Sequence, residues 1–189
     1  MAIALTPFRG FCGFLPLPQM LLLLSTVPEM RALIGDEPLR QLAATLDLAL
    51  PASSADSSKV DDELLRLADK STNGGKVEET SDEQKKALRG VFEVLMKASE
   101  EQVKRTLQSL LKRYTEADSS SSCATKAEEL LVGLVKQLNE QFPDDVGVLC
   151  CFILNVVELE VGKSVFLKAD EPHAYISGGE SDKVLGRAV

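Results

Sequence analysis

Apolar residues recur at the three- and four-residue spacing of an amphipathic helix through the middle of the chain. Each of three such stretches follows a hydroxyl residue with Gln or Glu three positions later, the pattern of a capping box that starts a helix. The pairs are Ser81 with Gln84, Ser99 with Gln102, and Thr125 with Glu128. We therefore expect helices to dominate this region, and we expect residues 82–142 to form a self-packed set of helices.

The first part of the chain also predicts helices. Residues 18–34 have a helical pattern in two pieces that break near Pro28, and Gly35 is placed to end the second piece. Pro38 then predicts the start of another helix. The apolar run Met20–Leu24 could dock a partner helix or a membrane, but packing against the helices that follow is the better explanation.

Strand patterns occur near both ends of the chain. Residues 2–5 form a short β-type run that Thr6 and Pro7 end. Residues 155–167 alternate apolar and polar positions on either side of Gly162 and Lys163, which predicts a β-hairpin. The expected order is therefore strand, helices, strands, an α+β class in which both ends resemble the middle of a larger domain.

Composition and charge exclude several partners. The 189 residues carry 21 Lys and Arg against 29 Asp and Glu, a formal charge of −8, so a nucleic acid would be repelled over most of the surface. An anionic substrate would need a local basic site. Prolines interrupt the apolar stretch 11–24, so we expect neither a signal peptide nor a membrane span there. The four cysteines include no C-x-x-C pair and fit a reducing, cytoplasmic location.

Few residues are candidates for chemistry. His173 is the only histidine, follows Pro172 and lies at a strand end, so it is either a metal ligand or an ordinary surface or hydrogen-bonded residue. Asp170 and Glu171 either support such a ligand or belong to a solvated loop. Arg187 could neutralise a phosphate or be merely solvated. The chain lacks the glycine-rich phosphate loops and the G-x-S-x-G elbow, which argues against nucleotide binding and serine hydrolysis.

Several segments resemble the type I mannose-6-phosphate isomerases in order and spacing, to about Gly178. They are Met1–Phe8, Cys12–Phe14, Val27–Gly35, Phe152–Asn155, Val161–Gly162, Phe166–Leu167 and Glu171–Tyr175. The resemblance implies a helical domain inserted between strands of a partial cupin barrel. It assigns residues 1–17 to a partial cupin strand segment, 18–145 to the helical domain and 146–189 to a partial return into the catalytic cupin.

The resemblance also implies a function. The family interconverts mannose 6-phosphate and fructose 6-phosphate with one Zn²⁺ per site and feeds GDP-mannose synthesis. His173 falls on the family's zinc-ligand histidine in a Pro-His-Ala-Tyr motif. Arg187 falls on the family's catalytic arginine when one residue is inserted. The expected partner is therefore a sugar phosphate.

The chain also departs from the family pattern. The family's other zinc ligands, a Gln-x-His pair and a Glu, lie upstream of the residue that matches Met1, and its second barrel lies downstream. We therefore expect an internal fragment or alternative product of such an isomerase, with impaired activity. Its unpaired strands would favour self-association. The alternative is a non-catalytic helical interaction module derived from that enzyme.

Overall fold

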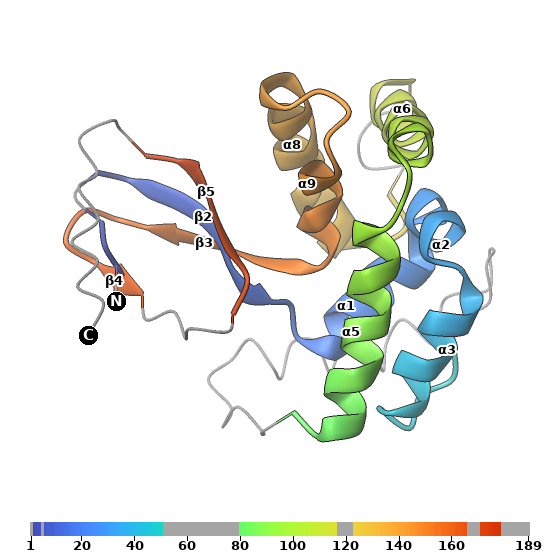
Figure 1. Ribbon diagram of the computed structural model, residues 1–189. Coiled ribbons are helices and arrows are strands. Elements are labelled where there is room, and N and C mark those ends of the chain that lie inside the picture. Colours follow the sequence, from blue (N-terminus) through green and yellow to red (C-terminus); the bar gives the residue numbers. More distant parts are fainter. Residues whose placement is uncertain (1, 5, 51–79, 117–122, 166–170, 179–189) are drawn as a thin grey trace. The chain divides into compact units, whose positions relative to one another are not determined.

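The computed structural model describes residues 2–4, 6–50, 80–116, 123–165 and 171–178. The chain divides into two compact units (Figure 1). One is a strand unit of residues 1–15 and 154–189, and the other is a helical unit of residues 16–153. The class is therefore mixed α+β, with the helical unit lying in the sequence between the two parts of the strand unit.

The helical unit begins with three short helices: α1 (Leu17–Thr26), α2 (Pro28–Ile34) and α3 (Asp36–Ala44). Pro28 is the first residue of α2, where its missing N–H removes no helical hydrogen bond. Gly35 ends α2 at φ 83°, a left-handed conformation that suits glycine. The predicted break and stop are thus confirmed. The third helix starts two residues before Pro38.

The apolar run Met20–Leu24 lies inside the helical unit. Its five side chains are at most 1% exposed. The run belongs to α1, which packs against α2 and α3. Packing within the unit, rather than docking of a partner, therefore accounts for this run. No helix in the described part of the chain combines the length and apolar character needed to cross a membrane.

The second half of the helical unit contains longer helices and then two short turns of helix. They are α5 (Asp82–Met96), α6 (Glu100–Glu116), α8 (Lys126–Gln141), α9 (Val146–Leu149) and η1 (Cys150–Phe152). The capping boxes of Ser81 with Gln84 and of Ser99 with Gln102 are both present, with each side chain bonded to the other residue's backbone N–H. All three predicted helix starts are therefore confirmed.

The partners of these helices differ in part from the prediction. α6 packs against α8, as expected of a self-packed set, and also against α2 and α9. The apolar stripe of α5, in contrast, packs against α3 and α2 (Figure 1). Its buried residues are Ala87, Val91 and Leu95. The prediction that the helices of residues 82–142 pack against one another is thus wrong for α5. The apolar stripe of a helix shows that one face is buried, but it does not specify the helix against which that face packs.

The described residues of the strand unit form two small antiparallel sheets. Their strands are β1 (Ala2–Ile3), β2 (Phe8–Phe14), β3 (Leu154–Leu159), β4 (Ser164–Val165) and β5 (His173–Ser177). β2 lies between β3 and β5, and β1 pairs with β4. The central strand of the larger sheet is thus β2, which brings the two ends of the sequence together.

The predicted hairpin of residues 155–167 is wrong in its pairing. β3 pairs with β2, and β4 pairs with β1, so the two expected hairpin strands belong to different sheets. The turn itself is present, because Lys163 donates its backbone N–H to the Glu160 carbonyl over 3.0 Å. Ala4 pairs with this turn, donating to the Lys163 carbonyl and accepting from the Gly162 N–H. The N-terminal segment therefore occupies the position that a hairpin partner would take.

Candidate metal-ligand site

The strand register places His173 beside Cys12. These two residues are direct partners across β2 and β5, and Gly10 is the partner of Tyr175. Directly opposed residues of an antiparallel pair project to the same face of the sheet. Because residues two apart on one strand also share a face, His173, Tyr175 and Cys12 lie on one side. Phe8 joins them, with its ring edge-on to that of Tyr175 at 5.3 Å between centroids.

The imidazole of His173 is exposed and held through one nitrogen. Its Nδ1 lies 3.0 Å from the backbone carbonyl oxygen of Glu171. A carbonyl only accepts hydrogen bonds, so in the neutral ring Nδ1 carries the proton and donates it. The lone pair is then on Nε2. This is the arrangement by which proteins fix the tautomer and orientation of a metal-binding histidine.

Cys12 is a weaker candidate ligand. Its half-buried thiol has its pKa raised by burial and, to a lesser degree, by the charge of Glu171. The thiolate is the form that binds metal, so both effects oppose ligation at neutral pH. Glu171 lies close to this strand, because a Cβ on Gly13 would be 3.7 Å from its Oε2 atom. The structure therefore brings one ready imidazole together with a protonated thiol and a carboxylate.

The described residues supply one suitable zinc ligand, His173, but not a complete zinc site. A catalytic zinc usually has three protein ligands. No group of three or more His, Cys, Asp or Glu residues placed to hold a metal occurs in the described part of the chain. Asp170 and Arg187 lie outside the described residues. His173 and Glu171 are thus the predicted site residues whose placement the structure gives.

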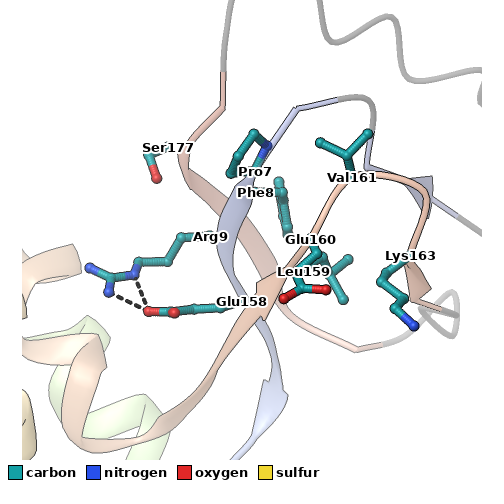
Figure 2. Close-up of a pocket in the computed structure, with 9 residues that line it drawn as sticks. All are labelled: Pro7, Phe8, Arg9, Glu158, Leu159, Glu160, Val161, Lys163 and Ser177. Carbon is teal, nitrogen blue, oxygen red and sulfur yellow. Dashed lines mark hydrogen bonds and ion pairs between the residues drawn. The ribbon is translucent and has the colours of Figure 1, made fainter.

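A shallow hollow of about 790 Å³ lies on the strand unit, lined by residues that include Pro7, Arg9, Glu158 and Lys163 (Figure 2). Arg9 is its candidate for binding an anion. Its Nε donates to Glu158 Oε1 over 2.7 Å, and its Nη2 bonds to the same oxygen. Lys163 is a second cation in the lining, but Glu158 and Glu160 supply two negative charges beside the two positive ones, so the hollow is not a ready phosphate site. His173 does not line it.

A second group of polar residues lies in the interior of the helical unit. Arg113 on α6 donates Nε to Glu29 Oε1 over 2.9 Å and Nη2 to Glu29 Oε2 over 2.7 Å. The same Nη2 lies 2.7 Å from Glu128 Oε1, and Tyr114 donates its hydroxyl to that oxygen over 3.0 Å. The Glu128 side chain has no exposed surface. One guanidinium thus joins carboxylates from α2 and α8.

These contacts change the ionisation of the group. Burial alone would lower the pKa of Arg113, but its hydrogen bonds to Glu29 and Glu128 outweigh this and raise it. Burial, followed by the charge of Glu128, raises the pKa of Tyr114 well above its ordinary value. Arg113 therefore stays charged and Tyr114 stays neutral at physiological pH. The group is suited to holding three helices together.

Comparison with known proteins shows a similarity over much of the helical unit. The family model of the type I phosphomannose isomerase helical insertion domain matches residues 64–154. Over 178 residues, 94% of this chain, the sequence is 41% identical to mannose-6-phosphate isomerase of Cryptococcus neoformans var. neoformans serotype D. The chain is similar in sequence to the type I phosphomannose isomerases. It is also 37% identical over 179 residues to mannose-6-phosphate isomerase of Saccharomyces cerevisiae.

The relatives are much longer than this chain. The chain spans 37% of the Cryptococcus protein and 35% of the yeast protein, about a third of each. Among solved structures, a zinc-bound mannose 6-phosphate isomerase aligns with 94% of this chain and 32% of its own length, with TM-score 0.52 and 19% identity. A phosphomannose isomerase variant from Salmonella typhimurium has the same coverage, with TM-score 0.54 and 20% identity. These likenesses support the phosphomannose isomerase fold.

The pattern of apolar and polar residues missed the strand that supports the site, although the family resemblance assigned residues 1–17 to a cupin strand segment. β2 (Phe8–Phe14) holds Cys12 opposite His173, yet its pattern does not predict a strand. Gly10 and Gly13 take two of its positions, and glycine is depleted in strands. No regular alternation was available as a signal, because the buried Phe11 follows the polar Arg9 on the same face and Gly10 has no side chain to classify.

Proposed function

We propose that this chain carries part of the catalytic site of a mannose-6-phosphate isomerase, an enzyme that interconverts mannose 6-phosphate and fructose 6-phosphate. The observation that carries the proposal is the geometry of His173, whose Nδ1 faces the Glu171 carbonyl at 3.0 Å and whose Nε2 is left to bind a metal. The likeness to named mannose-6-phosphate isomerases along 94% of the chain supports the same assignment.

The proposed architecture is a helical domain inserted into part of a cupin barrel. Residues 1–17 and 146–189 would contribute barrel strands, and residues 18–145 would form the helical domain. The three-stranded sheet β3-β2-β5 supports this proposal, because it collects strands from both ends of the chain. His173 and Tyr175 would then line the inside of the barrel.

Zn²⁺ is the proposed cofactor, and when bound it would act as a Lewis acid on the sugar's oxygen atoms. The contribution of this chain is the Nε2 atom of His173, oriented by the hydrogen bond from Nδ1 to Glu171. Arg187 is proposed, from its place in the sequence, to neutralise negative charge on the substrate. A single imidazole cannot fix the geometry of a catalytic zinc. We therefore expect the 189-residue chain alone to bind zinc weakly and to turn over slowly.

The proposed function is tested in a chimera with a longer relative. Residues 1–178 would replace the matching segment of the yeast relative, and the chimera would be assayed with mannose 6-phosphate in a coupled reaction. The expected result is turnover within about tenfold of the yeast enzyme and its loss on His173→Ala. Gly90→Ala, on an open face of α5, is the control and should leave turnover unchanged. A folded but inactive chimera, or one that tolerates His173→Ala, would refute the proposal.

Self-association is a further part of the proposal. In the described residues, β3 and β5 each pair with β2 alone, so each has an edge that can accept another strand. Sizing chromatography over a range of concentrations should show species larger than a monomer. A monomer at every concentration would argue against pairing through these edges. Association by an inactive chimera would favour the alternative, a helical interaction module without catalysis.

Two remaining assignments follow from composition and from the family. We place the protein in the cytoplasm, supported by its four free cysteines, and in carbohydrate metabolism upstream of GDP-mannose synthesis. No nucleic-acid or membrane partner is proposed, because the net charge of −8 opposes binding to anionic surfaces.

A further inference from the structure

Gly10 is a position in β2 with no space for a side chain. A Cβ atom there would lie 2.8 Å from the carbonyl oxygen of Ala174 and 2.5 Å from Cζ of Phe8. The Phe8 ring can rotate away, but the carbonyl belongs to the backbone of β5. The requirement is one of space, since Gly10 is not among the glycines with positive φ.

The obstructed carbonyl is next to the candidate ligand. Ala174 lies between His173 and Tyr175 on β5, and Gly10 is the direct partner of Tyr175. The register shifts between Arg9 and Gly10, because Arg9 pairs with Ser177 while Gly10 pairs with Tyr175. The pairing of β2 with β5 is thus irregular between Arg9 and Gly10. From Gly10 to the pair of Cys12 and His173 the pairing is regular.

We propose that Gly10 is a positioning residue for His173: by leaving space for the Ala174 carbonyl, it lets β5 lie close enough to β2 to hold the imidazole over Cys12. A side chain at this position pushes the Ala174 peptide away from β2. That displacement is transmitted through Ala174 to His173, one residue before the displaced peptide, and disturbs the hydrogen bond from Nδ1 to the Glu171 carbonyl.

The edge-on contact of Phe8 with Tyr175 depends on the same space. Phe8 precedes Gly10 by two residues on the same face, and Tyr175 lies across from Gly10. The aromatic pair therefore spans the position that lacks a side chain. Gly10 serves both the histidine and the aromatic residues of this face.

His173 is the only histidine, so its ring can be followed by itself. With ¹³C,¹⁵N-labelled histidine in the full chain, at mildly alkaline pH, the wild type should show one set of ring signals with the nitrogen shifts of the Nδ1–H tautomer. Gly10→Val should displace that signal and mix the tautomers. Gly10→Ala should displace it less, in the same direction.

Two controls distinguish crowding at Gly10 from the general effect of adding a side chain to the protein. Gly90→Val should leave the histidine signal unchanged, because an added Cβ there meets no described atom within 4 Å. Adding Phe8→Leu to Gly10→Val should not restore the signal, because the Ala174 carbonyl still obstructs the new side chain. Restoration by Phe8→Leu would overturn the proposal, since the aromatic ring would then be the relevant contact.

The role of Gly10 in metal binding rests on the proposed function, whereas its effect on the ring does not. Zinc chloride added to the wild-type chain should shift the His173 signal, and Gly10→Val should weaken this response about tenfold or more, as for other residues that orient a ligand. No response in the wild type at a zinc concentration high enough to detect weak binding would contradict the proposed function alone. An unchanged ring signal in folded Gly10→Val would overturn the positioning role. If Gly10→Val does not fold, the same comparison is made with Gly10→Ala, and an unchanged ring signal in that variant would overturn the role.

Discussion

Tyr114 donates its hydroxyl hydrogen to Oε1 of Glu128 over 3.0 Å in the interior of the helical unit. The other carboxylate oxygen of Glu128 accepts the backbone N–H of Ala124 over 2.7 Å. The same carboxylate also meets Arg113, so a fully buried acid is satisfied from three directions. This closed set of contacts joins α6 to the start of α8, and it makes the stability of the helical unit sensitive to single substitutions.

Arg113→Met should strongly destabilise the helical unit. The substitution removes the cation that Glu29 and Glu128 share, so the charges of these carboxylates lose their compensating positive charge. Breaking a buried ion pair in this way lowers the free energy of unfolding by about 3–5 kcal/mol. Urea denaturation followed by far-UV circular dichroism measures the change. Arg105→Met, which breaks only an exposed pair with Glu101, should cost less than about 1 kcal/mol, and equal losses would contradict the assigned role of Arg113.

Two helix-interior glycines should be sites of stabilisation. Gly90 on α5 and Gly133 on α8 meet no described atom within 4 Å of an added Cβ. Alanine at either position reduces the entropy of the unfolded chain and should raise the free energy of unfolding by about 0.5–1 kcal/mol. Thermal melts of Gly90→Ala and Gly133→Ala check this. Gly10→Ala is the matched opposite, and a higher melting temperature for it would contradict the crowding described at β2.

Alkaline pH should destabilise the fold through two cysteines. Burial raises the pKa of Cys150 from its ordinary value of 9.0 to about 11 and that of Cys151 to about 12. Below pH 9 both thiols are neutral in the folded and unfolded states. Above pH 9 only the unfolded chain ionises them, so the free energy of unfolding falls as the pH rises towards 11 and 12.

Urea midpoints at successive pH values measure this dependence. Replacing both residues, as Cys150→Ala with Cys151→Ala, lowers stability at every pH by the lost packing. It should nevertheless flatten the decline above pH 9. A decline of the same steepness in the double variant would show that other groups cause it.

The helix starts were the most predictable feature of the sequence, because capping depends on residues close together in the chain. The motif of Thr125 with Glu128 predicts the helix start but not the contacts of the Glu128 carboxylate. The Glu128 N–H does bond to the Thr125 hydroxyl, at 3.1 Å, but the carboxylate bonds to Ala124, Arg113 and Tyr114. The motif correctly predicted the helix start, whereas the buried ion pair depends on α2 and α6, which no local pattern specifies.

The strand pairing was less predictable. Alternation identified β3 and the turn after it, but the partner of β3 is β2, about 145 residues earlier in the chain. Adjacent strands favour a hairpin when nothing else competes, and here the N-terminal segment competes successfully. The candidate histidine was visible because it is unique, while its neighbour Cys12 emerged only from the register of β2 with β5.

The most direct test of His173 as a metal ligand is the zinc content of the chimera with the yeast relative, measured by elemental analysis after extensive dialysis. The intact chimera should retain about one zinc per chain. His173→Ala should retain far less, while Gly90→Ala, whose substitution lies in the helical unit, should retain the full amount. If the His173→Ala chimera is folded and still retains one zinc per chain, His173 is not a ligand.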